Sequence, residues 1–122
     1  MQKLNTSLLY KLTLALLLGV SNVFAQEIEW QNTSGGSSVD ALSTVRQTTD
    51  GGYILGGYSY SNSSGNKTEN CLGRSDYWIV KVDCVGTIMW ENTIGAAEYE
   101  FLFPLIQTND GGYLLGGSSD SY

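Results

Sequence analysis

The stretch DGGYILGG at residues 50–57 returns as DGGYLLGG at residues 110–117, 60 positions further along the chain. The likeness extends on both sides: residues 28–61 align with residues 88–121 without a gap, and 17 of the 34 aligned positions are identical. An internal repeat of this period indicates one supersecondary unit that packs on copies of itself, because a single copy cannot bury its own apolar faces. The repeat therefore decides the expected fold.

Four strands are predicted within one period, at residues 42–48, 52–59, 77–83 and 87–93. Asp50-Gly51 lies between the first two, and this pair is typical of a tight hairpin turn that needs positive φ angles. Gly56 and Gly57 fall inside a strand, where we expect a neighbouring sheet to approach too closely for a side chain. The 15 glycines and the many Thr, Tyr, Val and Ile residues disfavour helix. We therefore predict an all-β chain.

Antiparallel four-stranded units with apolar residues on both faces predict the blades of a β-propeller-like repeat. The expected layout is a partial blade at residues 26–41 that holds an outer strand, a full blade at 42–94 and a partial blade at 95–122 that holds the inner two strands. A ring needs roughly four blades or more. About one and a half repeats cannot close one, so we expect a fragment of a longer repeat protein. A β-solenoid or a sandwich is the weaker alternative.

Residues 1–25 have the pattern of a cleavable signal peptide. Positive charge at Lys3 and Lys11 accompanies an apolar run at residues 12–20, and Val23-Phe24-Ala25 supplies the small residues of a cleavage site. The run is shorter than the ~20 residues of a membrane anchor. We therefore expect an exported protein, in the periplasm, at the cell surface or outside the cell, with no membrane span after cleavage.

The predicted mature chain is strongly acidic. It keeps four basic residues against 12 acidic ones, a net charge of 4 − 12 = −8. Such a chain is repelled by polyanions, which excludes nucleic acid as a partner.

The motifs of one period also resemble a known repeat. Residues 50–59 read DGGYILGGYS, residues 76–83 read DYWIVKVD, and Gly86 and Trp90 follow. This series resembles the DGGY(I/L)LGG…DYW(I/V)VK(L/V)D…G…W repeats of large exported Bacteroidetes proteins. The resemblance covers almost all of residues 27–119. It implies a propeller-like fold and an association with type IX secretion, although the C-terminal sorting domain of those proteins is not in this sequence. It implies no enzyme activity, cofactor or catalytic residue.

A shorter likeness concerns residues 83–90, which read DCVGTIMW. The D-x-x-G-x-x-x-W pattern is similar to the tryptophan-docking repeat of quinoprotein propellers and to the Asp-box turn of sialidases. Both are scaffold motifs, so the likeness concerns the fold and not the chemistry. It nevertheless keeps one alternative open: a fragment of a propeller glycosidase or quinoprotein whose catalytic residues lie outside this chain.

The residues that catalysis commonly uses are scarce. The sequence has no histidine, no G-x-S-x-G motif and no glycine-rich loop leading into a helix. Asp50 and Asp110 precede Gly-Gly, but no D-x-D-x-D-G series surrounds them to supply the ligands of calcium. We therefore predict no catalytic, metal-binding or cofactor-binding residue and expect a non-enzymatic protein of binding, adhesion or surface assembly.

One rim of the predicted blade collects side chains suited to a ligand. The long connection at residues 60–75 shares that rim with the linkers at 34–41 and 94–101. Aromatic rings stack on sugars or peptides while amides and carboxylates fix their orientation. The expected partners are a glycan or a protein ligand, and further blades of the same or another chain. The candidate rim residues are Tyr58, Tyr60, Asn62, Asn66, Glu98, Tyr99 and Glu100. Solvated loops without a ligand are the alternative interpretation.

The two cysteines are expected either to form a disulfide or to lie far apart. Export and an even count favour a disulfide between Cys71 and Cys84. The blade arrangement instead places them at opposite ends of a strand, ~23 Å apart, whereas bonded cysteines need Cα atoms within ~7 Å. The separated arrangement is the favoured expectation.

Overall fold

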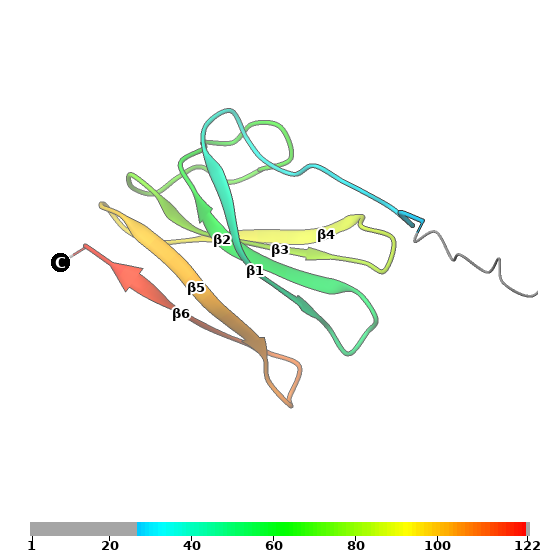
Figure 1. Ribbon diagram of the computed structural model, residues 1–122. Helices are drawn as coiled ribbons and strands as arrows, with labels where there is room; N and C mark the ends of the chain where they lie inside the picture. Colours follow the sequence, from blue (N-terminus) through cyan, green and yellow to red (C-terminus); the bar gives the residue numbers. More distant parts are fainter. Residues whose placement is uncertain (1–26, 122) are drawn as a thin grey trace, which may run out of the picture.

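The computed structural model describes residues 27–121, which form six β-strands in two layers (Figure 1). The strands are β1 (Asp40–Gln47), β2 (Tyr53–Ser59), β3 (Asp76–Val82), β4 (Ile88–Ile94), β5 (Glu100–Gln107) and β6 (Tyr113–Ser119). Neighbours in the first layer are antiparallel in the order β1-β2-β3-β4, and the second layer is the β5–β6 hairpin.

The predicted all-β fold is confirmed, and each of the four strands predicted in the first layer matches an observed strand to within two residues. The match reflects the alternation of side chains along β2 and β3 and the turn chemistry between strands. Within residues 27–121, no helix has the length and apolarity that crossing a membrane requires. The signal peptide predicted at residues 1–25 lies outside the described residues.

The repeat is present in the structure as well as in the sequence. The β5–β6 hairpin starts and ends 60 residues after the β1–β2 hairpin, and its Glu100 pairs with Ser119 as Asp40 pairs with Ser59. Both hairpins also contain a register shift in their first strand. The two hairpins are therefore copies of one unit.

The Asp-Gly turns form as predicted, with the positive φ confined to glycine. Gly51 has φ 83°, and its N–H donates to Thr48 O at 2.9 Å. Asp50 accepts from the Thr48 hydroxyl, from Gly52 N at 3.1 Å and from the buried Lys81, whose Nζ lies 2.9 Å from Asp50 Oδ2. These bonds, from Thr48 first and then from Lys81 and Gly52, hold the pKa of Asp50 far below its usual range. The carboxylate thus stabilises the turn and neutralises a buried ammonium.

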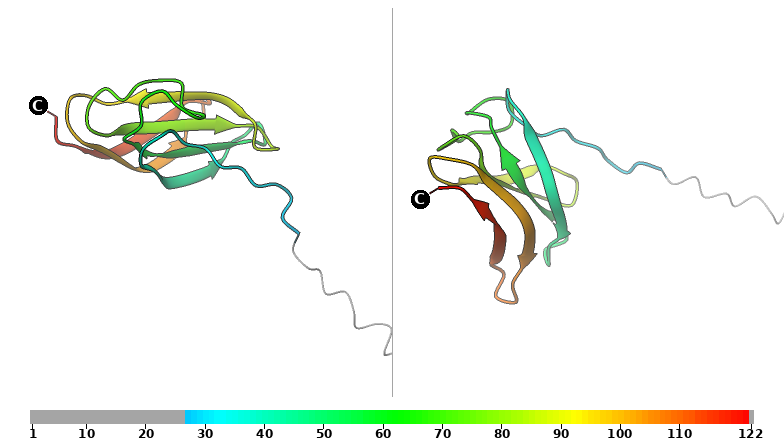
Figure 2. Two further views of the ribbon diagram at one scale, coloured as in Figure 1. Left: turned by 90° about the horizontal axis from the view of Figure 1, so that it is seen from above. Right: turned by 60° about the vertical axis from the view of Figure 1, so that its left-hand side comes forward.

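The hairpin packs on one face of the sheet, which we call the near face, and the opposite one is the far face (Figure 2). Ile54 and Ile79 of the near face form a core with Leu102 and Leu105 of β5, and all four side chains are buried. The remaining apolar core lies on the far face and contains Trp78, Val80 and Val82. The sheet is thus apolar on both faces, as a sheet covered on both sides requires.

The strand glycines are explained by close approach. A Cβ on Gly56 would lie 2.6 Å from Leu102 Cδ2, so the expected crowding by a second layer is confirmed there. Gly57 is crowded for another reason: its Cβ would lie 1.8 Å from Ala41 O in the adjacent strand of the same sheet. Gly56 therefore allows β5 of the second layer to pack closely on β2, and Gly57 allows the close approach of β1 within the sheet.

The outer strand predicted within the partial blade at residues 26–41 is wrong. Residues 27–39 contain no strand, and this segment crosses the far face instead of pairing with an edge. Asn32 Nδ2 donates to Gly86 O at 3.0 Å, which fixes the segment to the turn after β3. The segment has the composition of a strand, but a strand also needs a neighbour with free backbone groups.

The long connection between β2 and β3 is also less solvated than expected. Lys67 is 2% exposed, and its Nζ donates to Thr93 Oγ1 at 2.5 Å and to Glu69 O at 2.7 Å. Glu91 of β4 accepts from the Thr68 hydroxyl at 2.6 Å. The loop therefore folds back over the far face near β4, because a buried ammonium must keep its acceptors.

Candidate functional site

Four aromatic side chains from both layers meet at one end of the molecule. Tyr58 lies near the end of β2, Tyr60 directly after it, Tyr99 directly before β5 and Phe101 within β5. We call these four residues the aromatic surface. The backbone brings them together because Ser75, at the start of β3, bridges to Tyr99 and so anchors the entry of β5 beside the first layer.

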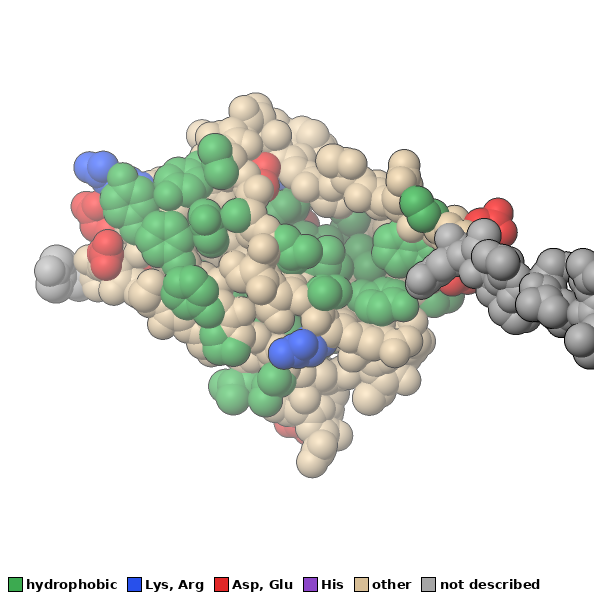
Figure 3. Space-filling model, in the orientation of Figure 1, with side chains coloured by type: hydrophobic (Ala, Val, Ile, Leu, Met, Phe, Trp, Pro, Cys, Tyr) green, Lys and Arg blue, Asp and Glu red, His purple; other side chains and the backbone are tan. Residues whose placement is uncertain are grey.

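The rings of the aromatic surface touch in a continuous series. Tyr58 meets Phe101 edge-on with centroids 4.8 Å apart, and Tyr60 lies 6.1 Å from Tyr58 and 6.3 Å from Tyr99. Tyr99 and Phe101 are parallel to within 5°, with centroids 6.1 Å apart. All four side chains are half-buried, so each ring packs on protein and also reaches solvent. Figure 3 shows hydrophobic side chains gathered on that side of the molecule, with charged side chains at their margin.

A charged pair borders the aromatic surface. Arg74 Nε lies 3.1 Å from Glu98 Oε2, and both side chains remain exposed. The guanidinium also lies over the Tyr99 ring, 5.4 Å from its centroid, and donates to the Tyr99 hydroxyl at 3.2 Å. The hydrogen bond with Tyr99 raises the pKa of Arg74, as does the nearby Glu98 carboxylate. Exposed donors and acceptors therefore stand beside the face of an aromatic ring.

The structure separates the predicted rim residues into two groups. Tyr58, Tyr60 and Tyr99 come together, with Glu98 at their margin. The two asparagines serve the loop: Asn62 Oδ1 accepts from Cys71 N at 3.2 Å, and Asn66 N donates to Gly35 O at 3.0 Å.

Glu100 belongs to the framework and not to the ligand rim. It is 3% exposed, and its carboxylate accepts from the Ser119 hydroxyl at 2.8 Å, the Ser121 hydroxyl at 2.6 Å and Ala96 N at 3.1 Å. Burial alone would raise the pKa of Glu100, but these hydrogen bonds outweigh it and lower the pKa. Buried in this way and bonded to the hairpin, the Glu100 carboxylate is not accessible to a ligand.

Sequence reasoning missed two members of this region, Phe101 and Arg74. The available signal for Phe101 was its spacing from Tyr99, since residues two apart in a strand share a face. Arg74 carried no comparable signal, because its position depends on the path of a long loop. Its backbone N–H donates to Glu98 O at 3.0 Å, which brings the arginine to the aromatic surface.

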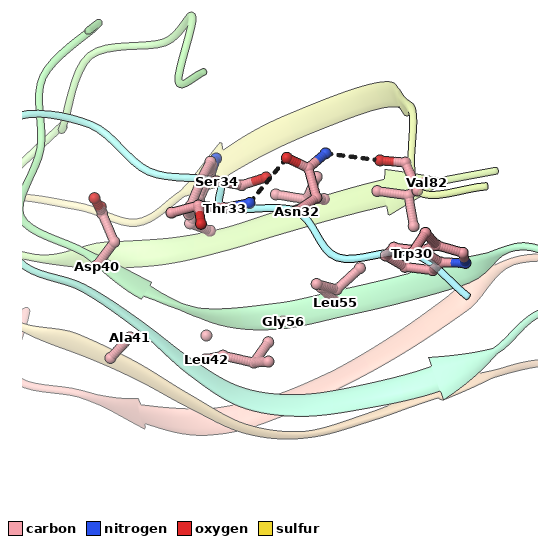
Figure 4. A pocket seen from close by; sticks show the side chains of 14 residues that line it. Trp30, Asn32, Thr33, Ser34, Asp40, Ala41, Leu42, Leu55, Gly56 and Val82 are labelled. Carbon is pink, nitrogen blue, oxygen red and sulfur yellow. Dashed lines mark hydrogen bonds between the residues drawn. The ribbon is translucent and has the colours of Figure 1, made fainter. Parts of the chain in front are cut away.

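A second candidate, an apolar groove of about 320 Å³, lies on the far face (Figure 4). The Trp30 ring lies between Leu55 and Val82, and Leu42 forms part of the wall. Asp40 is the titratable residue in its lining, and its carboxylate is occupied by Gly36 N at 2.7 Å and by the hydroxyls of Ser59 at 2.5 Å and Ser61 at 3.1 Å. The groove therefore offers apolar contact and no reactive group.

Both cysteines are free thiols. Cys71 Sγ donates to Asp76 Oδ2 at 2.7 Å, at the start of β3, whereas the exposed Cys84 follows the end of the same strand. The structure thus agrees with the separated arrangement. Burial, followed by the hydrogen bond with Asp76, raises the pKa of the Cys71 thiol.

Among the described residues, no group of three or more His, Cys, Asp or Glu side chains is arranged to hold a metal ion. Asp76 is fully buried, and its Oδ1 has no hydrogen-bond partner. Its other oxygen is used by Cys71, by Leu72 N at 2.6 Å and by Gly73 N at 3.4 Å. This cluster therefore anchors the loop before β3.

A scan against protein-family models gave no match for this chain. Searches of curated proteins and of solved structures gave no match either.

Proposed function

We propose that this chain is an exported, non-enzymatic repeat protein that binds a glycan or a protein ligand through the aromatic surface. One observation carries the proposal: four half-buried aromatic rings from two layers form a continuous surface beside the exposed pair Arg74 and Glu98. Rings of this kind offer apolar contact area at a low cost in conformational entropy, while the charged pair supplies directional hydrogen bonds.

Carbohydrate is the ligand class that fits this surface best. The Tyr99 and Phe101 rings are stacked and nearly parallel, and the exposed parts of these half-buried rings offer apolar surface to the C–H groups of a sugar ring. Arg74 and Glu98 can donate to and accept from hydroxyl groups at its edge. A peptide with an aromatic or proline residue would use the same contacts, and this is the form that a protein ligand would take.

The proposed architecture is a β-propeller-like series of blades. It is supported by the antiparallel order of the four-stranded sheet and by the way a second copy of its first hairpin packs face to face upon it. The export signal expected at residues 1–25 supports a location outside the cytoplasm. Surface binding or adhesion is the corresponding role.

The test is binding of the exported chain to immobilised polysaccharides and cell-wall material, followed by calorimetry with the oligosaccharide that is retained. Tyr99→Ala should weaken binding about tenfold or more, since it removes a ring and the partner of Arg74. Trp90→Ala is the control, because Trp90 is 40% exposed but packs against Tyr113, outside the aromatic surface. Equal affinities of Tyr99→Ala and the unchanged chain would overturn the assignment of the site. Retention of no glycan and no protein would overturn the function.

A further inference from the structure

The sheet and the hairpin each have one apolar face that no described residue fully covers. Leu42 and Val45, on the far face of β1, are 61% and 49% exposed. Ile106 and Leu114 pair on the outer side of the β5–β6 hairpin and are 48% and 60% exposed. Large apolar residues gathered on one surface indicate an interaction site.

The repeat shows what covers these faces elsewhere in the same molecule. Leu102 and Leu105 stand 60 residues after Leu42 and Val45 and are both 0% exposed, because they pack on the near face of the sheet. Likewise Ile54, 60 residues before Leu114, is 0% exposed beneath β5. The two exposed surfaces are therefore the two halves of an interface that the chain already makes once within itself.

A pair of glycines shows that the shapes are complementary. A Cβ on Gly56 would lie 2.6 Å from Leu102 Cδ2 and 3.1 Å from Leu105 Cδ1, so these two side chains occupy the space beside the glycine. At Gly116, its counterpart one repeat later, the nearest atoms belong to Pro104 of the same hairpin. The outer side of the hairpin thus presents, at Gly116, the position that two apolar side chains of the other layer cover at Gly56.

The aromatic contacts place a neighbouring unit on the far face as well. Trp90 packs against Tyr113 with centroids 5.9 Å apart and planes at 59°. Trp30 packs against Tyr53, one repeat earlier, at 6.0 Å and 61°. Residues near Trp30 therefore occupy the position that β4 takes against the following hairpin. The groove beside Trp30 is where the rest of a preceding unit would lie.

We propose that a second copy of this chain docks in that groove, with the outer side of its β5–β6 hairpin against the far face of the first copy. Leu42 and Val45 of one copy pack around Leu114 and Gly116 of the other. The interface is head-to-tail, so an open assembly always keeps one free surface of each kind at its two ends, and association continues to a ring or a filament. The proposed interface uses the end of β5 next to the β5–β6 turn, whereas the aromatic surface lies at the opposite end of that strand.

The negative charge of the chain opposes this assembly, so the salt dependence of association can identify the kind of interface. The chain carries a net charge of −6, and two like-charged copies repel each other. An apolar interface should therefore strengthen when salt screens the repulsion, whereas an interface held by ion pairs should weaken.

The test is the oligomeric state of the exported chain by analytical ultracentrifugation over a range of concentrations and salt. The unchanged chain should associate reversibly, and more strongly at high salt. Leu42→Glu and Leu114→Glu each place a carboxylate in the proposed interface and should weaken association at least about tenfold. Both side chains are exposed in one copy, so circular dichroism of either variant should match that of the unchanged chain. Val85→Glu, at a turn residue that is 64% exposed, is the control and should associate normally.

Mixing the two variants is the decisive experiment. The Leu42→Glu chain retains an intact hairpin, and the Leu114→Glu chain retains an intact far face, so a mixture should form 1:1 dimers and stop there. A monomeric unchanged chain would refute the proposal. So would association that ignores both substitutions, as edge-to-edge strand pairing would, or a mixture that remains monomeric, as a two-fold symmetric interface would give.

Discussion

The same residue type at the same position of two repeats should make very different contributions to stability. Leu102 and Leu42 stand 60 residues apart in the aligned hairpins, yet Leu102 is 0% exposed and Leu42 is 61% exposed. Replacement by alanine removes the same atoms from both. Only at Leu102 does it also open a cavity between two layers.

The expected magnitudes follow from this difference. Leu102→Ala should lower the free energy of unfolding by about 2–5 kcal/mol, the usual range for a buried leucine. Complete burial of a leucine contributes about 1.5–3 kcal/mol. Since Leu42 is only partly buried, Leu42→Ala should cost about 1 kcal/mol or less. Urea unfolding at concentrations too low for self-association measures both values.

Amide hydrogen exchange then locates the loss. An isolated two-stranded hairpin is marginal in water, so Leu102→Ala should expose the β5–β6 amides to exchange well before those of β2 and β3. Equal destabilisation by the two substitutions, or uniform exchange across both layers in Leu102→Ala, would refute the two-layer packing described above.

Three further predictions concern carboxylate and thiol groups. Asp50→Asn should destabilise the chain more than Asp110→Asn, measured by thermal unfolding, because only Asp50 has a buried lysine as its partner within the described structure. The folded-state pKa of Glu100 lies below its ordinary value of 4.5, so the stability that it contributes is present above pH 4.5 and is lost as the pH falls through the folded-state pKa. Glu100→Gln should therefore flatten the acid limb of a pH–stability curve, and an unchanged limb would contradict the role of its hydrogen bonds. Thiol titration should show Cys84 reacting quickly and Cys71 slowly in the folded chain, since burial raises the pKa of Cys71, and two equal rates would contradict this.

The fold was predictable where the interactions are local. Hairpin turns depend on adjacent residues such as Asp50 and Gly51, and the strands between them follow from alternating side chains. The segment at 26–41 was mispredicted to hold a strand because its composition is that of a strand, whereas its structure depends on which distant surface it meets. Trp30 nevertheless makes the contact expected from the repeat, because it packs against Tyr53 as Trp90 packs against Tyr113.

The candidate site was predictable only in part, for a related reason. Tyr58 and Tyr60 follow directly from the end of a predicted strand, so their shared rim could be expected. Glu100 looked like a solvated carboxylate because nothing local indicates that two serines about 20 residues further along the chain would surround it. Its set of hydrogen-bond donors repeats that of Asp40, which accepts from Gly36, Ser59 and Ser61. A longer side chain makes equivalent bonds in the second hairpin.

This comparison separates the positions that build the unit from those that distinguish one unit from another. The identical positions supply the turns, the crowded glycines and the serines that close each hairpin around its carboxylate. None of the four aromatic residues recurs in the other copy of the repeat: the counterparts of Tyr58, Tyr60, Tyr99 and Phe101 are Ser118, Asp120, Val39 and Ala41. A packing role shared by every unit would require similar side chains at both places. The aromatic surface is therefore an addition to the scaffold, and the ligand binding proposed above would explain why four rings are left half exposed at one end of an acidic chain.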